Sequence, residues 1–198
     1  MSKLYFKYGV MGSSKTAEAL MCRFNYIQKG FNVLLLKPNI DNRFEQENDS
    51  PKVVSRIGIS AECTKFSKDE DLSVLFIKEN LRQKIDIIIV DECQFATTEQ
   101  IEQLKQISLS TPVLCYGLLT NFQTKLFEGS KRLVEIADSL MEIKSVCKCG
   151  RKAMINSRWQ NWKLVTHGEE VLIGGDDTYE GICYTCYLKE IQKQSKEN

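Results

Sequence analysis

A glycine- and serine-rich turn between an apolar strand and a helix constrains the fold of this chain more than any other feature. Residues 3–8 alternate as a short strand does, and residues 15–29 have apolar side chains at helical spacing. Between them lies Gly-Val-Met-Gly-Ser-Ser-Lys-Thr, residues 9–16. Backbone N–H groups at a helix N-terminus after such a turn converge on phosphate oxygens. The turn therefore predicts a nucleotide phosphate-binding loop.

This loop supplies a cation and a hydroxyl to a bound nucleotide. We expect Lys15 to place its charge on the β- and γ-phosphates and Thr16 to hold Mg²⁺ through its hydroxyl. The position before the lysine, usually glycine in such loops, is Ser14. The alternative interpretation is a plain Gly/Ser turn with an exposed lysine. The predicted phosphate-binding residues here are Gly9, Val10, Met11, Gly12, Ser13, Ser14, Lys15 and Thr16.

Strands and helices alternate along the next hundred residues. Residues 32–37, 85–90 and 112–117 are apolar runs typical of strands buried on both faces, and residues 97–107 predict an amphipathic helix. This alternation predicts an α/β fold, a RecA-like P-loop domain with a mostly parallel sheet flanked by helices. The polar stretch 39–51 has no clear period, so we expect a mobile loop that closes over ligands.

Two adjacent carboxylates follow one of these strands. Asp91 and Glu92 come directly after the apolar run 87–90, and ligands of open α/β sheets gather at the carboxyl ends of the strands. We expect Asp91 to serve the metal and Glu92 to accept the proton of an attacking hydroxyl. A solvated strand end is the structural alternative. The same pair also occurs in helicase-type ATPases, where it positions Mg²⁺ and water, so alone it does not separate a kinase from an ATPase.

Four of the eight cysteines form two close pairs near the C-terminus. Cys147 and Cys149 are separated by one residue, and Cys183 and Cys186 by two. Four thiolates suit a closed, structural tetrahedral Zn²⁺ site, and reduced surface thiols are the alternative. The remaining cysteines, Cys22, Cys63, Cys93 and Cys115, are expected to pack as small apolar residues. The single histidine, His167, lies in a polar stretch and is excluded from the predicted site.

The change of composition at the cysteines predicts a division of the chain. We expect a P-loop nucleotide-binding domain over residues 1–143, a small zinc-binding domain over 144–190, and a solvated or frayed tail over 191–198.

Charge and hydropathy narrow the classes of partner. The 27 Lys and Arg residues nearly balance the 26 Asp and Glu residues, for a formal net charge of +1, so we expect no nucleic-acid partner. The longest apolar run, residues 85–90, contains Asp86 and is far shorter than the roughly 20 residues that cross a bilayer. Residues 1–7 lack the pattern of a secretory signal. The sequence predicts a soluble cytoplasmic protein without a membrane partner.

Taken together, these motifs resemble those of the type II thymidine kinases over nearly the whole chain. The matching segments are residues 9–16, 37–43, 55–58, 91–95, 116–118, Phe122, residues 127–129, residues 173–179 and the two cysteine pairs. The chain departs from the family pattern at Ser14, at Gly12, where a larger residue is frequent, at Arg56, usually histidine, and at Asn156, commonly threonine. The first cysteine pair is also one residue short.

The resemblance implies a kinase that moves the γ-phosphate of ATP to the 5′-hydroxyl of thymidine, and of deoxyuridine, with Glu92 as catalytic base. It implies a phosphate and metal group of Lys15, Thr16, Asp41, Arg43, Asp91 and Gln94. The implied base pocket consists of Met11, Phe95, Leu118, Phe122, Phe127, Asn156 and Tyr179. The backbone of a lasso segment would bind the thymine edges, through Val171, Leu172, Ile173, Gly174 and Gly175.

The resemblance also implies a homotetramer and feedback inhibition by deoxythymidine triphosphate (dTTP), the end product of the pathway. Three alternatives stay open at this point. Each aromatic residue of the base pocket could simply pack the core. The chain could be a nucleic-acid-dependent P-loop ATPase with a zinc ribbon, or a module that binds nucleotide without turnover.

Overall fold

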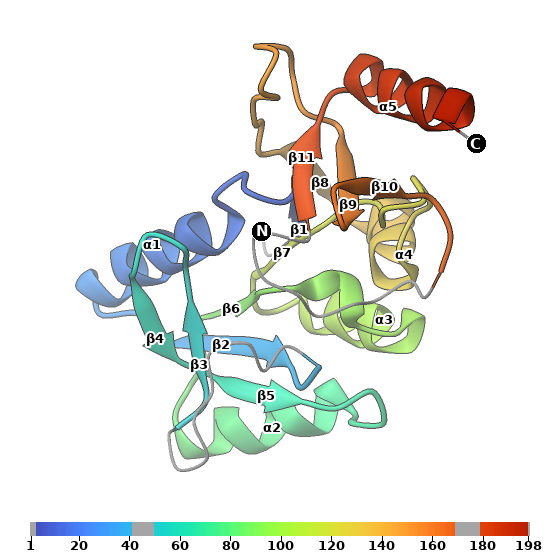
Figure 1. Cartoon of the computed structure of the whole chain (residues 1–198). Coiled ribbons are helices and arrows are strands. Elements are labelled where there is room, and N and C mark those ends of the chain that lie inside the picture. Colours follow the sequence, from blue (N-terminus) through green and yellow to red (C-terminus); the bar gives the residue numbers. More distant parts are fainter. Residues whose placement is uncertain (1–2, 41–49, 169–178, 198) are drawn as a thin grey trace.

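A parallel sheet forms the centre of the molecule. The computed structural model describes residues 3–40, 50–168 and 179–197. Six strands form the sheet in the order β5-β2-β6-β7-β1-β8, and every neighbouring pair is parallel. The strands are β1 (Leu4–Tyr8), β2 (Val33–Pro38), β5 (Thr64–Phe66), β6 (Ile87–Val90), β7 (Val113–Gly117) and β8 (Ser139–Glu142). The predicted α/β class with a mostly parallel sheet is confirmed (Figure 1).

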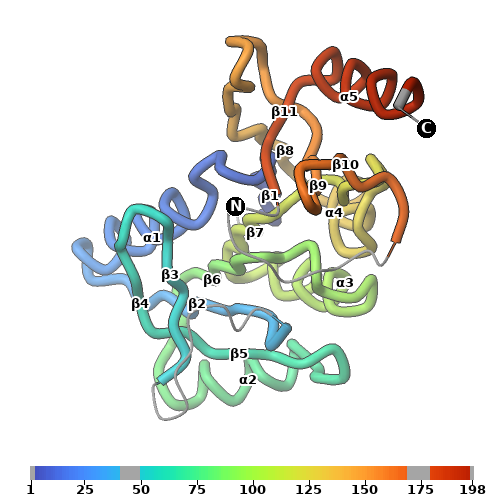
Figure 2. The backbone as a smooth tube through the Cα atoms, in the orientation of Figure 1, coloured from blue at the N-terminus to red at the C-terminus, as the bar shows by residue number. Residues whose placement is uncertain are grey.

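Helices and a hairpin cover the two faces of this sheet. The helices are α1 (Lys15–Gln28), α2 (Leu72–Arg82), the 3₁₀ turn η1 (Cys93–Phe95), α3 (Thr98–Ile107) and α4 (Glu128–Ile136). Apolar side chains of α2, α3 and α4 pack together with one face of the strands. Those of α1 pack with the other face, beside Val53 of the hairpin β3 (Lys52–Val54) and β4 (Ser60–Glu62). Both layers can be followed in Figure 2.

The strand order brings the ends of three strands together. Strand β7 lies between β1 and β6, so the loop that leaves β1 and the carboxylates that follow β6 flank the end of the same strand. All four residues of β6 are fully buried, which explains their continuous Ile-Ile-Ile-Val sequence. A buried sheet of this kind gives the two predicted motifs a rigid support.

A second, smaller sheet contains the C-terminal strands. Strands β9 (Ile155–Gln160), β10 (Lys163–Val165) and β11 (Tyr179–Ile182) are antiparallel in the order β10-β9-β11, and α5 (Tyr184–Glu197) follows. Figure 1 shows this sheet beside the loop that links β1 to α1.

The helices and strands predicted from periodicity occur within one or two residues of the expected bounds. The C-terminal tail differs from the expectation, because α5 is helical as far as Glu197. Its lysine, glutamate and glutamine residues are good helix formers, so a polar composition did not prevent regular structure. The polar loop 39–51 lies mostly outside the described residues. In the part of the chain that the structure describes, no helix is both long and apolar enough to cross a membrane.

Candidate active site

The loop after β1 has two residues in the left-handed backbone region. Gly12 has a φ of 78° and Ser14 a φ of 63°. Helix α1 begins at Lys15, immediately after Ser14, so its N-terminal N–H groups face the loop. A left-handed conformation costs a residue with a Cβ about 1 kcal/mol. The serine therefore adds strain where glycine would add none.

The lysine of this loop is buried against it. Its Nζ donates to the backbone oxygen of Val10 at 2.8 Å and lies 3.5 Å from Ser13 Oγ. Burial lowers the pKa of Lys15 to about 8, although the charges of Glu92 and Asp91 act in the opposite direction. An ammonium that has lost its water is stabilised by a nearby anion, so the site favours a bound phosphate group.

Asp91 faces the first turn of α1. Thr16 Oγ1 donates to Asp91 Oδ1 at 3.4 Å, and Asp91 is 4 % exposed. Burial first, and then the charge of Glu92, raise the pKa of Asp91 to about 7. A hydroxyl beside a buried carboxylate offers hard oxygen ligands, and a divalent cation would keep that carboxylate ionised. The two residues fit the Mg²⁺ predicted from the sequence.

Glu92 is fixed both by its backbone and by a neighbouring side chain. Its φ of 51° lies in the left-handed region, which non-glycine residues adopt mainly where the surrounding structure enforces it. Gln94 donates from Nε2 to Glu92 Oε2 at 2.6 Å, while its Oε1 accepts from the N–H of Leu118 at 3.0 Å. Gln94 is 2 % exposed. The amide thus holds the predicted base in place against the end of β7.

The small sheet contacts the phosphate loop directly. Asn156 of β9 accepts from the N–H of Met11 at 2.7 Å and donates from Nδ2 to the oxygen of Thr120 at 2.7 Å. A Cβ at Gly181 of β11 would lie 2.9 Å from Met11 O and 2.9 Å from Val10 Cγ2, so only glycine allows this approach. The β9–β11 pair therefore backs the loop that is predicted to bind phosphate.

The predicted base-pocket aromatics are packed against other side chains of the structure. The rings of Phe95 and Phe127 meet edge to face at 5.8 Å, and Arg158 Cζ lies 5.0 Å from the centre of the Phe122 ring. Phe122 and Phe127 are 1 % and 6 % exposed. Leu118 is buried as well, and Tyr179 is half-buried.

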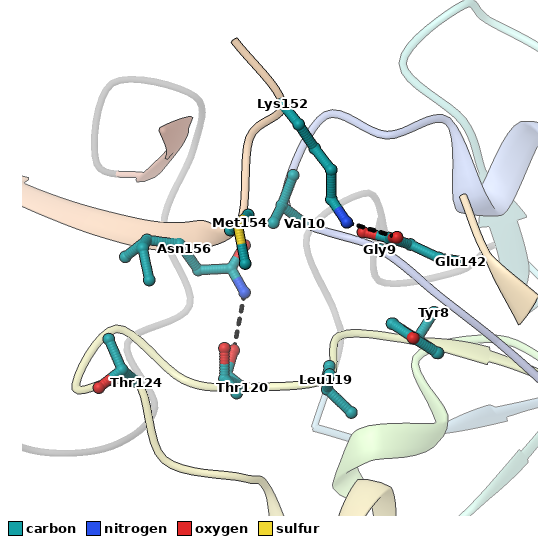
Figure 3. A pocket seen from close by; sticks show the side chains of 11 residues that line it. Tyr8, Gly9, Val10, Leu119, Thr120, Thr124, Glu142, Lys152, Met154 and Asn156 are labelled. Carbon is teal, nitrogen blue, oxygen red and sulfur yellow. Dashed lines mark hydrogen bonds and ion pairs between the residues drawn. The ribbon is translucent and has the colours of Figure 1, made fainter. Parts of the chain in front are cut away.

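Two cavities lie near these residues. One of about 320 Å³ is lined by residues that include Gly9, Val10 and Asn156, and by Lys152 and Glu142, which form an ion pair at 2.6 Å (Figure 3). The other, of about 250 Å³, is lined by Phe95 with Pro38, Phe66 and neighbouring residues. Of the predicted base-pocket residues, Asn156 lines the first and Phe95 the second.

Comparison with known proteins identifies the family of this arrangement. The model of the thymidine kinase family matches residues 2–187. A thymidine kinase of Rhodopirellula baltica is 40% identical over 200 residues, which cover 100% of this chain and 93% of that protein. The chain belongs to the thymidine kinase family. A thymidine kinase of Pasteurella multocida is 42% identical over 194 residues, covering 96% of this chain and 99% of the relative.

One solved structure resembles this chain only distantly. The X-ray structure of the ATPase DotB of Legionella pneumophila covers 76% of this chain and 43% of its own at 16% identity, with a TM-score of 0.38. A likeness so distant carries no argument about this thymidine kinase family member.

Four cysteines of this thymidine kinase family member converge on one point. The Sγ atoms of Cys147, Cys149, Cys183 and Cys186 all lie within 4.8 Å of one another. Tetrahedral zinc with Zn–S bonds of about 2.3 Å places its sulfurs about 3.8 Å apart, so the cluster fits the ion and the short first pair does not prevent convergence. Cys147 and Cys183 belong to an apolar cluster that includes Val10 of the phosphate loop.

The backbone around these cysteines also favours a metal. The N–H of Cys186 lies 3.4 Å from Cys183 Sγ and, with the neighbouring thiols, lowers the pKa of Cys183 to about 6. Hydrogen bonds with Cys149 and the other thiols raise the pKa of Cys186 to about 12. Neighbouring thiols share their protons in this way, and a bound cation would displace these protons.

Several predicted residues of the kinase site fall outside the described residues. They are Asp41, Arg43, Val171, Leu172, Ile173, Gly174 and Gly175. Two contacts were not predicted from the sequence. One is the hydrogen bond from Gln94 that supports Glu92, and the other is the close approach of Gly181 to the phosphate loop. An isolated glycine in a strand was the available signal for Gly181, because it often marks close approach of another backbone.

Proposed function

We propose that this chain transfers the γ-phosphate of ATP to the 5′-hydroxyl of thymidine, and of deoxyuridine, giving the nucleoside monophosphate and ADP. One observation carries the proposal: in a chain of this family, Gln94 holds the carboxylate of Glu92 at 2.6 Å just after β6, and the adjacent Asp91 accepts a hydrogen bond from Thr16 at the end of the phosphate loop. A carboxylate at that edge can receive the proton of an alcohol that attacks a phosphate on the loop.

The reaction is an in-line displacement. The 5′-oxygen forms a bond to the γ-phosphorus, the bond from that phosphorus to the β–γ bridging oxygen breaks, and ADP leaves. Glu92 takes the proton of the 5′-hydroxyl, while Lys15 and the N–H groups at the start of α1 stabilise the charge on the phosphates. Arg43 and Asp41 are proposed to complete this group.

Two metals belong to the proposal. Thr16 and Asp91 would hold Mg²⁺, which neutralises charge on the β- and γ-phosphates. The cysteine cluster would hold zinc with four thiolates and no open coordination position, so the zinc serves structure and not chemistry.

The specificity elements are proposed by the same reasoning. The base would be held by Met11, Phe95, Leu118, Phe122, Phe127, Asn156 and Tyr179, and its edges by the backbone of residues 171–175. These last residues form part of a lasso domain proposed to span residues 144–190, next to a P-loop domain of residues 1–143. A homotetramer, inhibition by dTTP, a cytoplasmic location and the absence of a nucleic-acid partner are further parts of the proposal.

Incubation of the protein with γ-labelled ATP and thymidine tests the reaction. Label in thymidine monophosphate supports the proposal. Hydrolysis of ATP that nucleic acid stimulates, or bound ATP without turnover, contradicts it.

Substitution of the base gives a sharper test. Glu92→Gln keeps the shape and the acceptor for Gln94 but cannot take a proton, so turnover should fall about 100-fold or more with nucleotide binding nearly intact. Glu99→Gln removes an exposed carboxylate of α3 and is the matched control. Turnover of the Glu92 variant within twofold of the unaltered enzyme would refute the assignment.

A further inference from the structure

The β3–β4 hairpin ends in a tight, fully bonded turn. Ser55 and Ile59 are joined by a backbone bond of 2.9 Å, and the N–H of Gly58 donates to Ser55 O at 3.0 Å. Ser55 Oγ adds a bond of 3.0 Å to Ile59 O, and Gly58 has a φ of 85°. The turn that contains Arg56 is therefore short, and its own hydrogen bonds hold its backbone in place.

The hairpin is also anchored to the main body. Val53 of β3 is 1 % exposed and packs with Ala19 and Leu20 of α1, the helix that begins at the phosphate loop. Figure 1 shows the hairpin beside α1. Because hairpin and loop contact the same helix, the position of the hairpin tip relative to the loop is set by core packing.

The tip places a guanidinium beside the phosphate loop. A Cβ built on Gly12 would lie 3.6 Å from Arg56 Nη1, and it would meet no other atom outside the adjoining residues within 4 Å. A longer side chain at position 12 would take the space that the guanidinium occupies. The absence of a side chain at Gly12 therefore allows the cation to approach the backbone that cradles phosphate.

The charge of Arg56 also acts on the lysine of the phosphate loop. It acts on Lys15, helping to lower the pKa of that ammonium, while Asp91 and Glu92 act in the opposite direction. Lys15 is predicted to contact the β- and γ-phosphates, so a cation that acts on Lys15 is placed to act on the same phosphates. Guanidinium is the side chain best suited to bind a phosphate with two parallel hydrogen bonds.

We propose that Arg56 is a further catalytic residue, which reaches across Gly12 from the hairpin to the γ-phosphate end of the bound nucleoside triphosphate and stabilises its charge during transfer. The inference rests on the proposed function for the reaction, but its binding component does not need turnover. An arginine placed in this way acts most strongly on the phosphate that moves, and less on the two phosphates that remain in ADP.

Two affinities in the same variant test this idea. Binding of ADP and of a non-hydrolysable ATP analogue, each with Mg²⁺, is measured by calorimetry for the unaltered protein and for Arg56→Gln. Loss of a hydrogen bond to a charged group weakens binding by roughly 10- to 100-fold. We expect at least a tenfold loss for the ATP analogue and less than a threefold loss for ADP. Turnover with thymidine should fall by at least the same factor as the analogue affinity.

Matched variants separate this role from general charge and from folding. Arg82→Gln removes an exposed cation of α2 that pairs with Glu79, and both affinities should stay unchanged. Arg56→Lys keeps the charge but loses the planar fork, so it should restore part of the lost affinity. Equal losses for ADP and the ATP analogue, or no loss for either, would overturn the proposal. If the unaltered protein fails to phosphorylate thymidine, the proposed function fails, and the ratio of the two affinities still decides the role of Arg56.

Discussion

The side-chain amide of Asn156 offers a quantitative test of how the small sheet supports the phosphate loop. Asn156→Leu keeps a similar volume but removes both 2.7 Å bonds, to the N–H of Met11 and to the oxygen of Thr120. Asn156 is 2 % exposed, so water cannot replace the amide without rearrangement. Each buried polar partner left without a bond costs about 1–3 kcal/mol. Because Met11 and Thr120 are only half-buried, we expect a total loss of about 2–4 kcal/mol.

Urea unfolding measures this loss, and calorimetry with ATP measures its effect on the loop. We expect a lower midpoint with an unchanged m-value, together with weaker ATP binding, because the backbone at Met11 loses its fixed position. Ser157→Ala is the control. Its hydroxyl donates at 2.7 Å to Glu180 O and accepts from Trp159 Nε1 at 2.8 Å, and as the neighbouring residue on the strand it points to the opposite face of β9. Loss of these two bonds should lower stability by about 1–3 kcal/mol without changing ATP affinity. An Asn156→Leu protein that binds ATP as tightly as the unaltered protein would refute the proposed support of the loop.

Two other predictions follow from the local geometry. Ser14→Gly removes the strain of a left-handed serine at φ 63°, so the free energy of unfolding should rise by up to about 1 kcal/mol in urea titrations, and a fall would show that the serine is not strained. Removal of zinc by a chelator should lower Tm and weaken ATP binding, since Cys147 and Cys183 pack with Val10 of the phosphate loop. Metal analysis should find one zinc per chain, and about none in Cys183→Ser, with Cys63→Ser as the control. A cysteine cluster that binds no zinc, or ATP affinity that is indifferent to its removal, would contradict this coupling.

Local patterns predicted the parts of the fold that depend on nearby residues. The buried run of β6 requires apolar side chains on both faces of the sheet. The turn before Lys15 requires a backbone that can approach a phosphate closely. The cysteine spacing likewise predicted a cluster that the structure brings within 4.8 Å. The strand and the turn could be predicted because each is determined by a few neighbouring residues. The cluster could be predicted because two close cysteine pairs suit one metal, although 34 residues separate Cys149 from Cys183.

Long-range packing could not be predicted in the same way. Gln94 supports Glu92 through a bond to Leu118, 24 residues away, and Asn156 reaches Met11 across 145 residues. Nothing in the immediate sequence of these amides specifies such partners. The helix α5 was missed for a different reason. Its first half has apolar residues at helical spacing, Tyr184, Tyr187, Leu188 and Ile191, but residues 192–197 are all polar and present no apolar face to a periodicity search.

The central claim concerns the position of one carboxylate relative to one alcohol. A crystal structure with thymidine, Mg²⁺ and a non-hydrolysable ATP analogue measures the distance between Glu92 and the 5′-oxygen. We predict that the carboxylate lies within about 3.2 Å of this oxygen, or is joined to it through one water, with the triphosphate seated at the start of α1. A carboxylate turned away from the sugar, too distant to reach the alcohol even through a water, would contradict the account.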